Sequence, residues 1–183
     1  LDLPADVTAS TGLDALTQLL EPLTSVRANP MTDAWARDGL RHAKALRNAY
    51  DNGKDLEART SMAYASVLGG LCLANAGLGA VHGFAAPVGG MFPAPHGAVC
   101  AALLPHCTAA NLAALRARQT DSPALARYDE AARILIGDQA QADDLVPWLM
   151  ALTKDLGIPG LASYGLSASE VDDVCEKAAK ASS

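Results

Sequence analysis

The chain has few aromatic residues, and its apolar surface comes from small and aliphatic side chains. Aromatic residues make up 4% of 183 residues, whereas half of all residues are hydrophobic, mostly alanine and leucine. This composition is typical of one helical globular domain. A chain of this length buries roughly 70% of its unfolded surface, so it needs no disulfide bonds to be stable.

Closely spaced cysteine pairs are also lacking. The four cysteines are Cys72, Cys100, Cys107 and Cys175, and no two of them form a CxxC pair. Each lies in an apolar or helical context, which favours reduced, buried thiols over a disulfide framework. Reduced thiols are typical of the cytosol, so we predict a cytoplasmic protein.

No cluster of basic residues and no long uninterrupted apolar run is present. The net charge of −6 comes from dispersed Asp and Glu, which argues against a nucleic-acid partner. The longest apolar run, Ala65–Leu78, contains three glycines and is too short for a membrane span. Residues 1–6 have neither the basic nor the apolar region of a signal peptide. We therefore expect a soluble protein without a membrane partner.

An initiator methionine is missing as well. The chain begins at Leu1, in what looks like the approach to a helix, and its last residues, 178–183, end in Ala-Ser-Ser. We expect a domain cut from a longer protein.

Helical periodicity dominates what is present. Ser10 or Thr11 is expected to cap a first helix that ends or kinks at Pro22. Further helices are predicted over 32–50, 55–75, 78–87, 96–104, 109–118, 123–136, 142–156 and 168–179. The helix over 55–75 is apolar on nearly every side in its second half, which predicts a central helix, and Pro105 predicts a stop. The fold class is all-α, one domain of seven to nine helices.

Two of the four histidines, His82 and His96, lie fourteen residues apart in a stretch rich in glycine and proline. Imidazole is a common metal ligand, so this pair indicates an open metal site. Asp14 and Gln18 share a helix face at the border of the apolar stripe and could complete such a site. Their spacing alone favours another reading, in which Asp14 is a solvated residue stabilised by the helix dipole.

Several ordered motifs resemble one known family. They are TGLDALTQ at 11–18, then Glu21, ANPMTD at 28–33, LANAGLGAVH at 73–82, PHGA at 95–98 and LLP at 103–105. In this order they resemble the C-terminal helical domain of the iron-containing, or group III, alcohol dehydrogenases, whose helical domain is of the dehydroquinate synthase-like type. The relatives include maleylacetate reductases and glycerol dehydrogenases.

The resemblance implies that residues 1–183 are a helical metal-binding domain and that the family's N-terminal NAD(P)-binding α/β domain is absent from this chain. It further implies a divalent metal, Fe²⁺ or Zn²⁺, held by Asp14, His82 and His96. The family's second ligand position, a histidine in many members, falls on Gln18, which binds weakly, acts through water or points away. Ala86 stands where many relatives carry another histidine, so a proton relay through that position is lost.

The activity implied by the resemblance is hydride exchange between NAD(P) and an alcohol, aldehyde or keto-acid substrate. The implied assembly is a homo-oligomer in which this domain contacts its own N-terminal domain, and the isolated chain is expected to be inactive. A second hypothesis is a catalytically silent helical module whose metal site has eroded at Gln18 and Ala86. Glu21 is interpreted as structural and Cys100 as a buried thiol, so both stay outside the predicted site.

Overall fold

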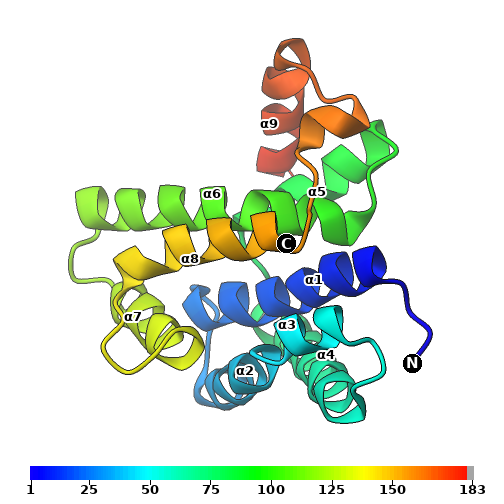
Figure 1. Ribbon diagram of the computed structural model, residues 1–183. Coiled ribbons are helices and arrows are strands. Elements are labelled where there is room, and N and C mark those ends of the chain that lie inside the picture. The colour runs from blue at the N-terminus through cyan, green and yellow to red at the C-terminus, as the bar shows by residue number, and fades with distance from the viewer. Residues whose placement is uncertain (181–183) are drawn as a thin grey trace.

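Nine α-helices and two short 3-10 helices form between Leu1 and Lys180, the part of the chain described by the computed structural model, and no strand forms there (Figure 1). The all-α prediction is confirmed. The α-helices are α1 (Ala5–Thr24), α2 (Pro30–Ala43), α3 (Leu46–Asp51), α4 (Leu56–Ala76), α5 (Ala80–Met91), α6 (His96–Arg118), α7 (Pro123–Leu135), α8 (Ala142–Asp155) and α9 (Val171–Lys180). The 3-10 helices are η1 (Leu161–Tyr164) and η2 (Ala168–Glu170).

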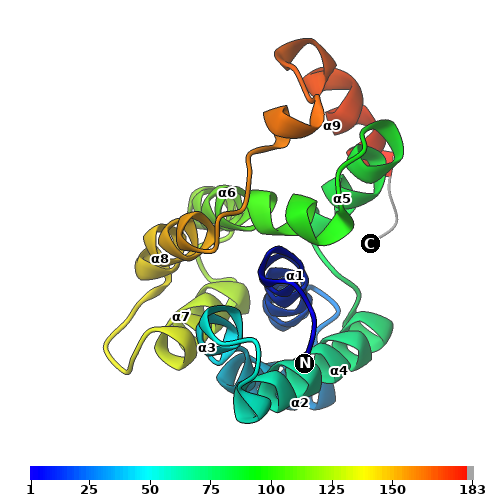
Figure 2. The same ribbon diagram turned by 45° about the vertical axis from the view of Figure 1, so that its right-hand side comes forward.

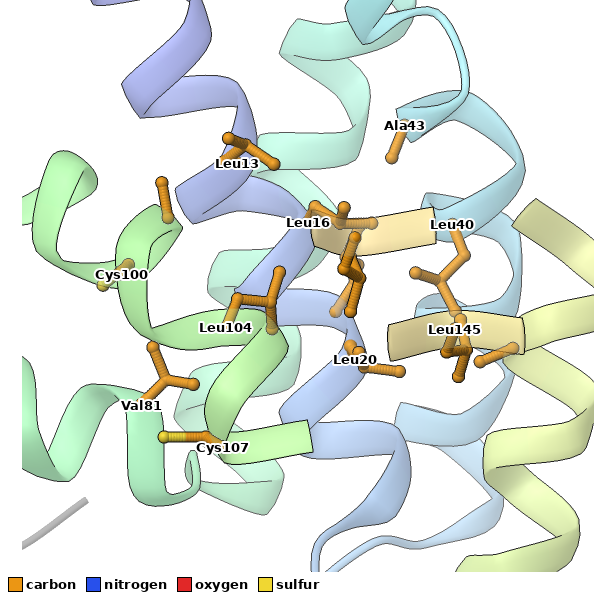
Figure 3. Close-up of a cluster of buried hydrophobic side chains, with 14 of the residues drawn as sticks. Leu13, Leu16, Leu20, Leu40, Ala43, Val81, Cys100, Leu104, Cys107 and Leu145 are labelled. Carbon is orange, nitrogen blue, oxygen red and sulfur yellow. The ribbon is translucent and has the colours of Figure 1, made fainter. Parts of the chain in front are cut away.

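Helix α1 is the centre of the fold. Seen almost end-on in Figure 2, it lies between α6 and α8 on one side and α2, α3 and α4 on the other. Its leucines Leu13, Leu16 and Leu20 are fully buried. Figure 3 shows Leu16 and Leu20 between Leu104 of α6 and Leu40 of α2. A helix packed on so many sides is fixed in position, so the polar residues that interrupt its apolar surface are fixed too.

Helix α4 was predicted to be this central helix, and that prediction is wrong. One side of α4 packs on α1 and α2, whereas Val67, Leu71 and Leu73 are 60%, 40% and 41% exposed. An apolar composition on all sides indicates that a helix can be buried, but the arrangement of its neighbours decides how much of it is.

The first helix begins earlier than predicted. Pro4 precedes its first residue, and no side chain caps it. The hydroxyl groups of Ser10 and Thr11 instead donate to the carbonyl of Val7 inside the helix. Pro22 does not end α1, which continues to Thr24. A proline in the last turn removes one hydrogen bond, which the burial of this helix can offset.

Prolines fail to end two other helices. The two helices predicted before and after Pro105 form one helix, α6, and α5 runs past Pro87 to Met91. Both helices pack along neighbours over much of their length, and this burial outweighs the lost hydrogen bond and the local clash. The helix predicted over 32–50 is instead two helices, α2 and α3, with a break at Lys44 and Ala45.

By length and apolar composition, one helix of the described chain, α6, could cross a membrane. Helices α4 and α5 taken together would also be long and apolar enough for one span, but the chain bends by 99° between them. Half of the apolar window of α6 is buried inside the fold, where it packs on α1, α5 and α8. This burial is what a core helix shows.

Candidate metal centre

Three helices supply the predicted metal ligands. Asp14 lies on the central helix α1, His82 is in the first turn of α5 and His96 is the first residue of α6. The N-terminal ends of α5 and α6 therefore both point into one region beside α1. The positive ends of helix dipoles stabilise nearby anions, so a carboxylate is favoured at this junction.

The structure brings these three residues together. The Nε2 atom of His82 lies 3.2 Å from Asp14 Oδ1, and the Nε2 atom of His96 lies 3.8 Å from the same oxygen. The two imidazole rings have centroids 5.4 Å apart. His82 follows Asp14 by 68 positions and His96 follows it by 82, yet both imidazoles meet the same carboxylate. This is the geometry that the sequence hypothesis required.

Cys100 belongs to the same cluster, although the sequence interpretation set it aside. Its Sγ lies 3.5 Å from His96 Nε2 and 3.8 Å from His82 Nε2. One potential ligand atom from each of Asp14, His82, His96 and Cys100 lies within 4.8 Å of all the others. The available signal was the i, i+4 spacing from His96, which places the two side chains on one face of α6.

Glu21 is the second residue that sequence reasoning left outside the site. Its Oε2 accepts a hydrogen bond from His82 Nδ1 at 2.7 Å, and its Oε1 accepts one from the backbone N–H of Val81 at 2.7 Å. Both carboxylate oxygens are therefore engaged. A hydrogen bond at Nδ1 fixes the imidazole tautomer and turns Nε2 toward Asp14.

Gly79 allows this close approach of Glu21 to the start of α5. A Cβ atom at position 79 would lie 2.8 Å from Glu21 Oε1, which is closer than real contacts of this kind. The absence of a side chain thus lets the carboxylate reach the backbone of α5. The sequence signal for Glu21 was its spacing: it follows Asp14 by seven residues, which places both side chains on the same side of α1.

The environment of His82 has opposing effects on its pKa. Burial disfavours the charged imidazolium and lowers the pKa, but hydrogen bonds with Asp14, Cys100 and Glu21 outweigh it and raise the pKa to about 11. Metal binding requires a neutral imidazole, so a metal at Nε2 would take the place of this proton.

Gln18 contacts the cluster through its amide nitrogen. Gln18 Nε2 donates to Asp14 Oδ1 at 3.3 Å, and Gln18 Oε1 lies on the side of Gly69 in α4. In this orientation the amide positions the carboxylate and does not present its carbonyl oxygen. Ala86 is exposed one turn after His82 and has no group that could carry a proton.

The cluster is closed at one end and open at the other. The side chains of His82 and Asp14 are 7% and 18% exposed, whereas that of His96 is 53% exposed. A small molecule would therefore approach from the His96 side.

Comparisons with known proteins identify the family of this chain. Residues 8–183 match the model of the Fe-containing alcohol dehydrogenase family, C-terminal. Alcohol dehydrogenase 4 of Saccharomyces cerevisiae is 37% identical over 178 residues, which are 96% of this chain and 45% of that protein. The 1,3-propanediol dehydrogenase of Klebsiella pneumoniae is 38% identical over 179 residues, 97% of this chain and 46% of that protein.

Two solved structures show the same fold. A 1,3-propanediol oxidoreductase has a TM-score of 0.88 at 35% identity, covering 98% of this chain and 47% of that chain. A maleylacetate reductase from a Rhizobium species has a TM-score of 0.82 at 26% identity, covering 100% of this chain and 48% of that chain. The chain belongs to the iron-containing alcohol dehydrogenase family and matches its C-terminal, helical part. It spans about half the length of the curated relatives that it matches.

Proposed function

We propose that this chain is the metal-binding helical part of a metal-dependent, NAD(P)-linked oxidoreductase that acts on an alcohol or on the corresponding aldehyde or keto acid. The observation that carries the proposal is the convergence of Asp14, His82 and His96 on one point, with Nε2 of His82 directed there by Glu21. Relatives named as alcohol and 1,3-propanediol dehydrogenases support the reaction class.

The donor set fits a divalent transition metal. Two imidazoles and one carboxylate are ligands that suit Fe²⁺ and Zn²⁺. Asp14, His82 and His96 would hold the metal, which supplies Lewis acidity toward an alcohol or carbonyl oxygen.

The residues of this chain then position the reactants and hold protons at defined atoms. Glu21 keeps the proton of His82 at Nδ1, and Gln18 orients Asp14 through its amide nitrogen. The exposed edge of His96 leaves the site accessible from one side. Because Ala86 cannot titrate, position 86 cannot relay a proton to or from the substrate.

The nicotinamide cofactor supplies the hydride chemistry. We propose that NAD(P) binds mainly to a part of the protein outside this chain, which is supported by the chain spanning about half of its relatives. A homo-oligomeric assembly and a cytoplasmic location remain predictions from the sequence.

Metal content tests the proposal directly. The chain is loaded with Zn²⁺, or with Fe²⁺ under anaerobic conditions, passed through a desalting column and subjected to elemental analysis. We expect about one metal per chain, as one cluster of this kind predicts. An Asp14→Ala/His82→Ala variant should lose it, and so should Asp14→Asn, which preserves side-chain shape.

A matched control is Asp121→Ala/His106→Ala, which removes the same residue types at exposed positions. It should bind metal like the unchanged chain. If the unchanged chain retains no more metal than Asp14→Asn, the proposal fails and the silent helical module is the better hypothesis. Alcohol oxidation with NAD(P)⁺ is measured on a longer protein that contains this chain, and we expect no turnover by the chain alone.

A further inference from the structure

The fourth corner of the cluster is occupied by a thiol. The residue at the family's second ligand position, Gln18, offers an N–H to Asp14, whereas Cys100 Sγ lies beside both imidazole nitrogens. We propose that Cys100 is the fourth protein ligand, so that this chain binds its metal through one carboxylate, two imidazoles and one thiolate. The inference rests on the proposed metal site and deepens it.

Four of the six distances among the donor atoms lie near those of a tetrahedral site. With Zn–N and Zn–O near 2.0–2.1 Å and Zn–S near 2.3 Å, tetrahedral edges measure about 3.3 Å between nitrogen and oxygen and about 3.6 Å to sulfur. The distances from Asp14 Oδ1 to the two imidazole nitrogens are 3.2 and 3.8 Å, and those from Cys100 Sγ to the same nitrogens are 3.5 and 3.8 Å. All six edges are within 4.8 Å, so the side chains would draw closer around a metal to complete the coordination.

The backbone holds Cys100 in this place. It lies one turn after His96 on α6, and the residue is fully buried. Figure 3 shows it on the segment of α6 that runs beside α1. Its sulfur contacts the two imidazoles, whereas the thiol of buried Cys72 donates to the backbone carbonyl of Thr32.

Ligation is a proton exchange without a change of oxidation state. Burial is the largest effect on Cys100 and raises its pKa, although the hydrogen bond with His82 opposes this. When the metal binds, the S–H bond breaks, the proton leaves to solvent and a metal–sulfur bond forms. The carboxylate and the thiolate together then balance the charge of a divalent cation.

A thiolate would also change which metals the site prefers. Sulfur ligands favour Zn²⁺, Co²⁺ and Fe²⁺ over Mg²⁺ and Mn²⁺, which prefer oxygen. Helix α6 would then supply the fourth ligand, which Gln18 of α1 does not offer in its present orientation.

X-ray absorption of the zinc-loaded whole chain tests the inference without any mutation. We expect one sulfur neighbour at about 2.3 Å among nitrogen and oxygen neighbours. The cobalt-loaded chain should show a thiolate-to-cobalt charge-transfer band in the near ultraviolet, and Cys100→Ser should abolish it.

The matched control is Cys107→Ser, because Cys107 is another buried thiol of α6 and lies outside the cluster. It should keep the band. Cys100→Ser should weaken zinc binding by about 100-fold or more. Losing a residue that only supports a ligand costs at most about 100-fold, and losing a ligand should cost at least as much. Circular dichroism on both variants monitors folding.

The outcomes separate the two proposals. Zinc bound with no sulfur neighbour, with binding lost in Asp14→Asn and retained in Cys100→Ser, overturns the role of Cys100 and leaves the proposed function intact. If Asp14→Asn binds zinc as well as the unchanged chain does, both proposals fail.

Discussion

Glu21 of α1 and Asp33 of α2 are both buried carboxylates, each 7% exposed, but they face different partners. Glu21 accepts from His82 and from a backbone N–H, as described above. Asp33 accepts from the guanidinium of Arg127 in α7 at 2.9 Å and lies 3.8 Å from that of Arg37. The first carboxylate lies beside the proposed metal site and the second joins helices.

The difference lies in what each partner can do with its proton. A guanidinium does not lose its proton in proteins, so the pair of Asp33 and Arg127 is a permanent connection between α2 and α7. Arg127 also donates to the carbonyl of Leu23 in α1, which extends the connection. An imidazole can lose one proton and offer the freed lone pair to a metal while its other nitrogen stays bound to a carboxylate. A carboxylate–imidazole pair is therefore suited to a site, and a carboxylate–guanidinium pair to a scaffold.

The largest expected effect comes from breaking the scaffold pair. Asp33→Ala leaves the partly buried guanidinium of Arg127 without its carboxylate. The free energy of unfolding should fall by about 3 kcal/mol. This is the lower end of the range for breaking a buried ion pair, because Arg127 is about a quarter exposed. Urea unfolding measures it. Asp51→Ala, which removes an exposed partner of Arg47, is the control and should change stability little. Without urea, where both variants are folded, their metal affinity should equal that of the unchanged chain. A loss of metal binding in Asp33→Ala would contradict the view that Asp33 serves the scaffold and Glu21 the site.

Glu21→Gln tests the site pair. The amide has one acceptor oxygen for two donors, His82 Nδ1 and the Val81 N–H, so it cannot hold the imidazole as the carboxylate does. We expect metal affinity to fall by about 10- to 100-fold. Competition with a chelator measures the affinity, and Glu57→Gln on the exposed side of α4 is the control. Unchanged affinity in Glu21→Gln would show that Glu21 serves the fold alone.

The pH dependence of stability distinguishes the two carboxylates further. In the metal-free folded chain the pKa of His82 is raised from 6.5 to about 11, so the folded state binds one more proton than the unfolded state between these values. The stabilisation is complete below pH 6.5 and is lost as the pH rises toward 11. Between pH 7 and 8.5 the unfolding free energy should fall by up to about 1.4 kcal/mol per pH unit.

Urea unfolding at several pH values measures this slope. Asp33→Ala should keep it, because the arginine partner does not titrate in this range, and Glu21→Gln should reduce it. A slope that is equally reduced in both variants would contradict the comparison.

Local patterns were sufficient to predict most helices and the histidine pair of the cluster. The helical periodicity before Pro22 and over 55–75 is a local feature, and the structure has α1 and α4 at these places. The resemblance to the family identified Asp14, His82 and His96, which the structure brings together. The stop predicted at Pro105 is wrong, and α1 continues past Pro22, where an end or a kink is predicted, because a proline penalty of a few kcal/mol competes with burial that the sequence alone does not show.

The sequence by itself determined that the chain is helical and which side chains can bind a metal, because helix periodicity and ligand chemistry are properties of short segments. Only the tertiary structure decided that α1 and not α4 is central, that Glu21 meets His82 across 61 positions, and that Cys100 lies beside both imidazoles. These contacts depend on how α1, α5 and α6 pack. Packing is set by the summed burial of many side chains far apart in the chain, which no short motif encodes.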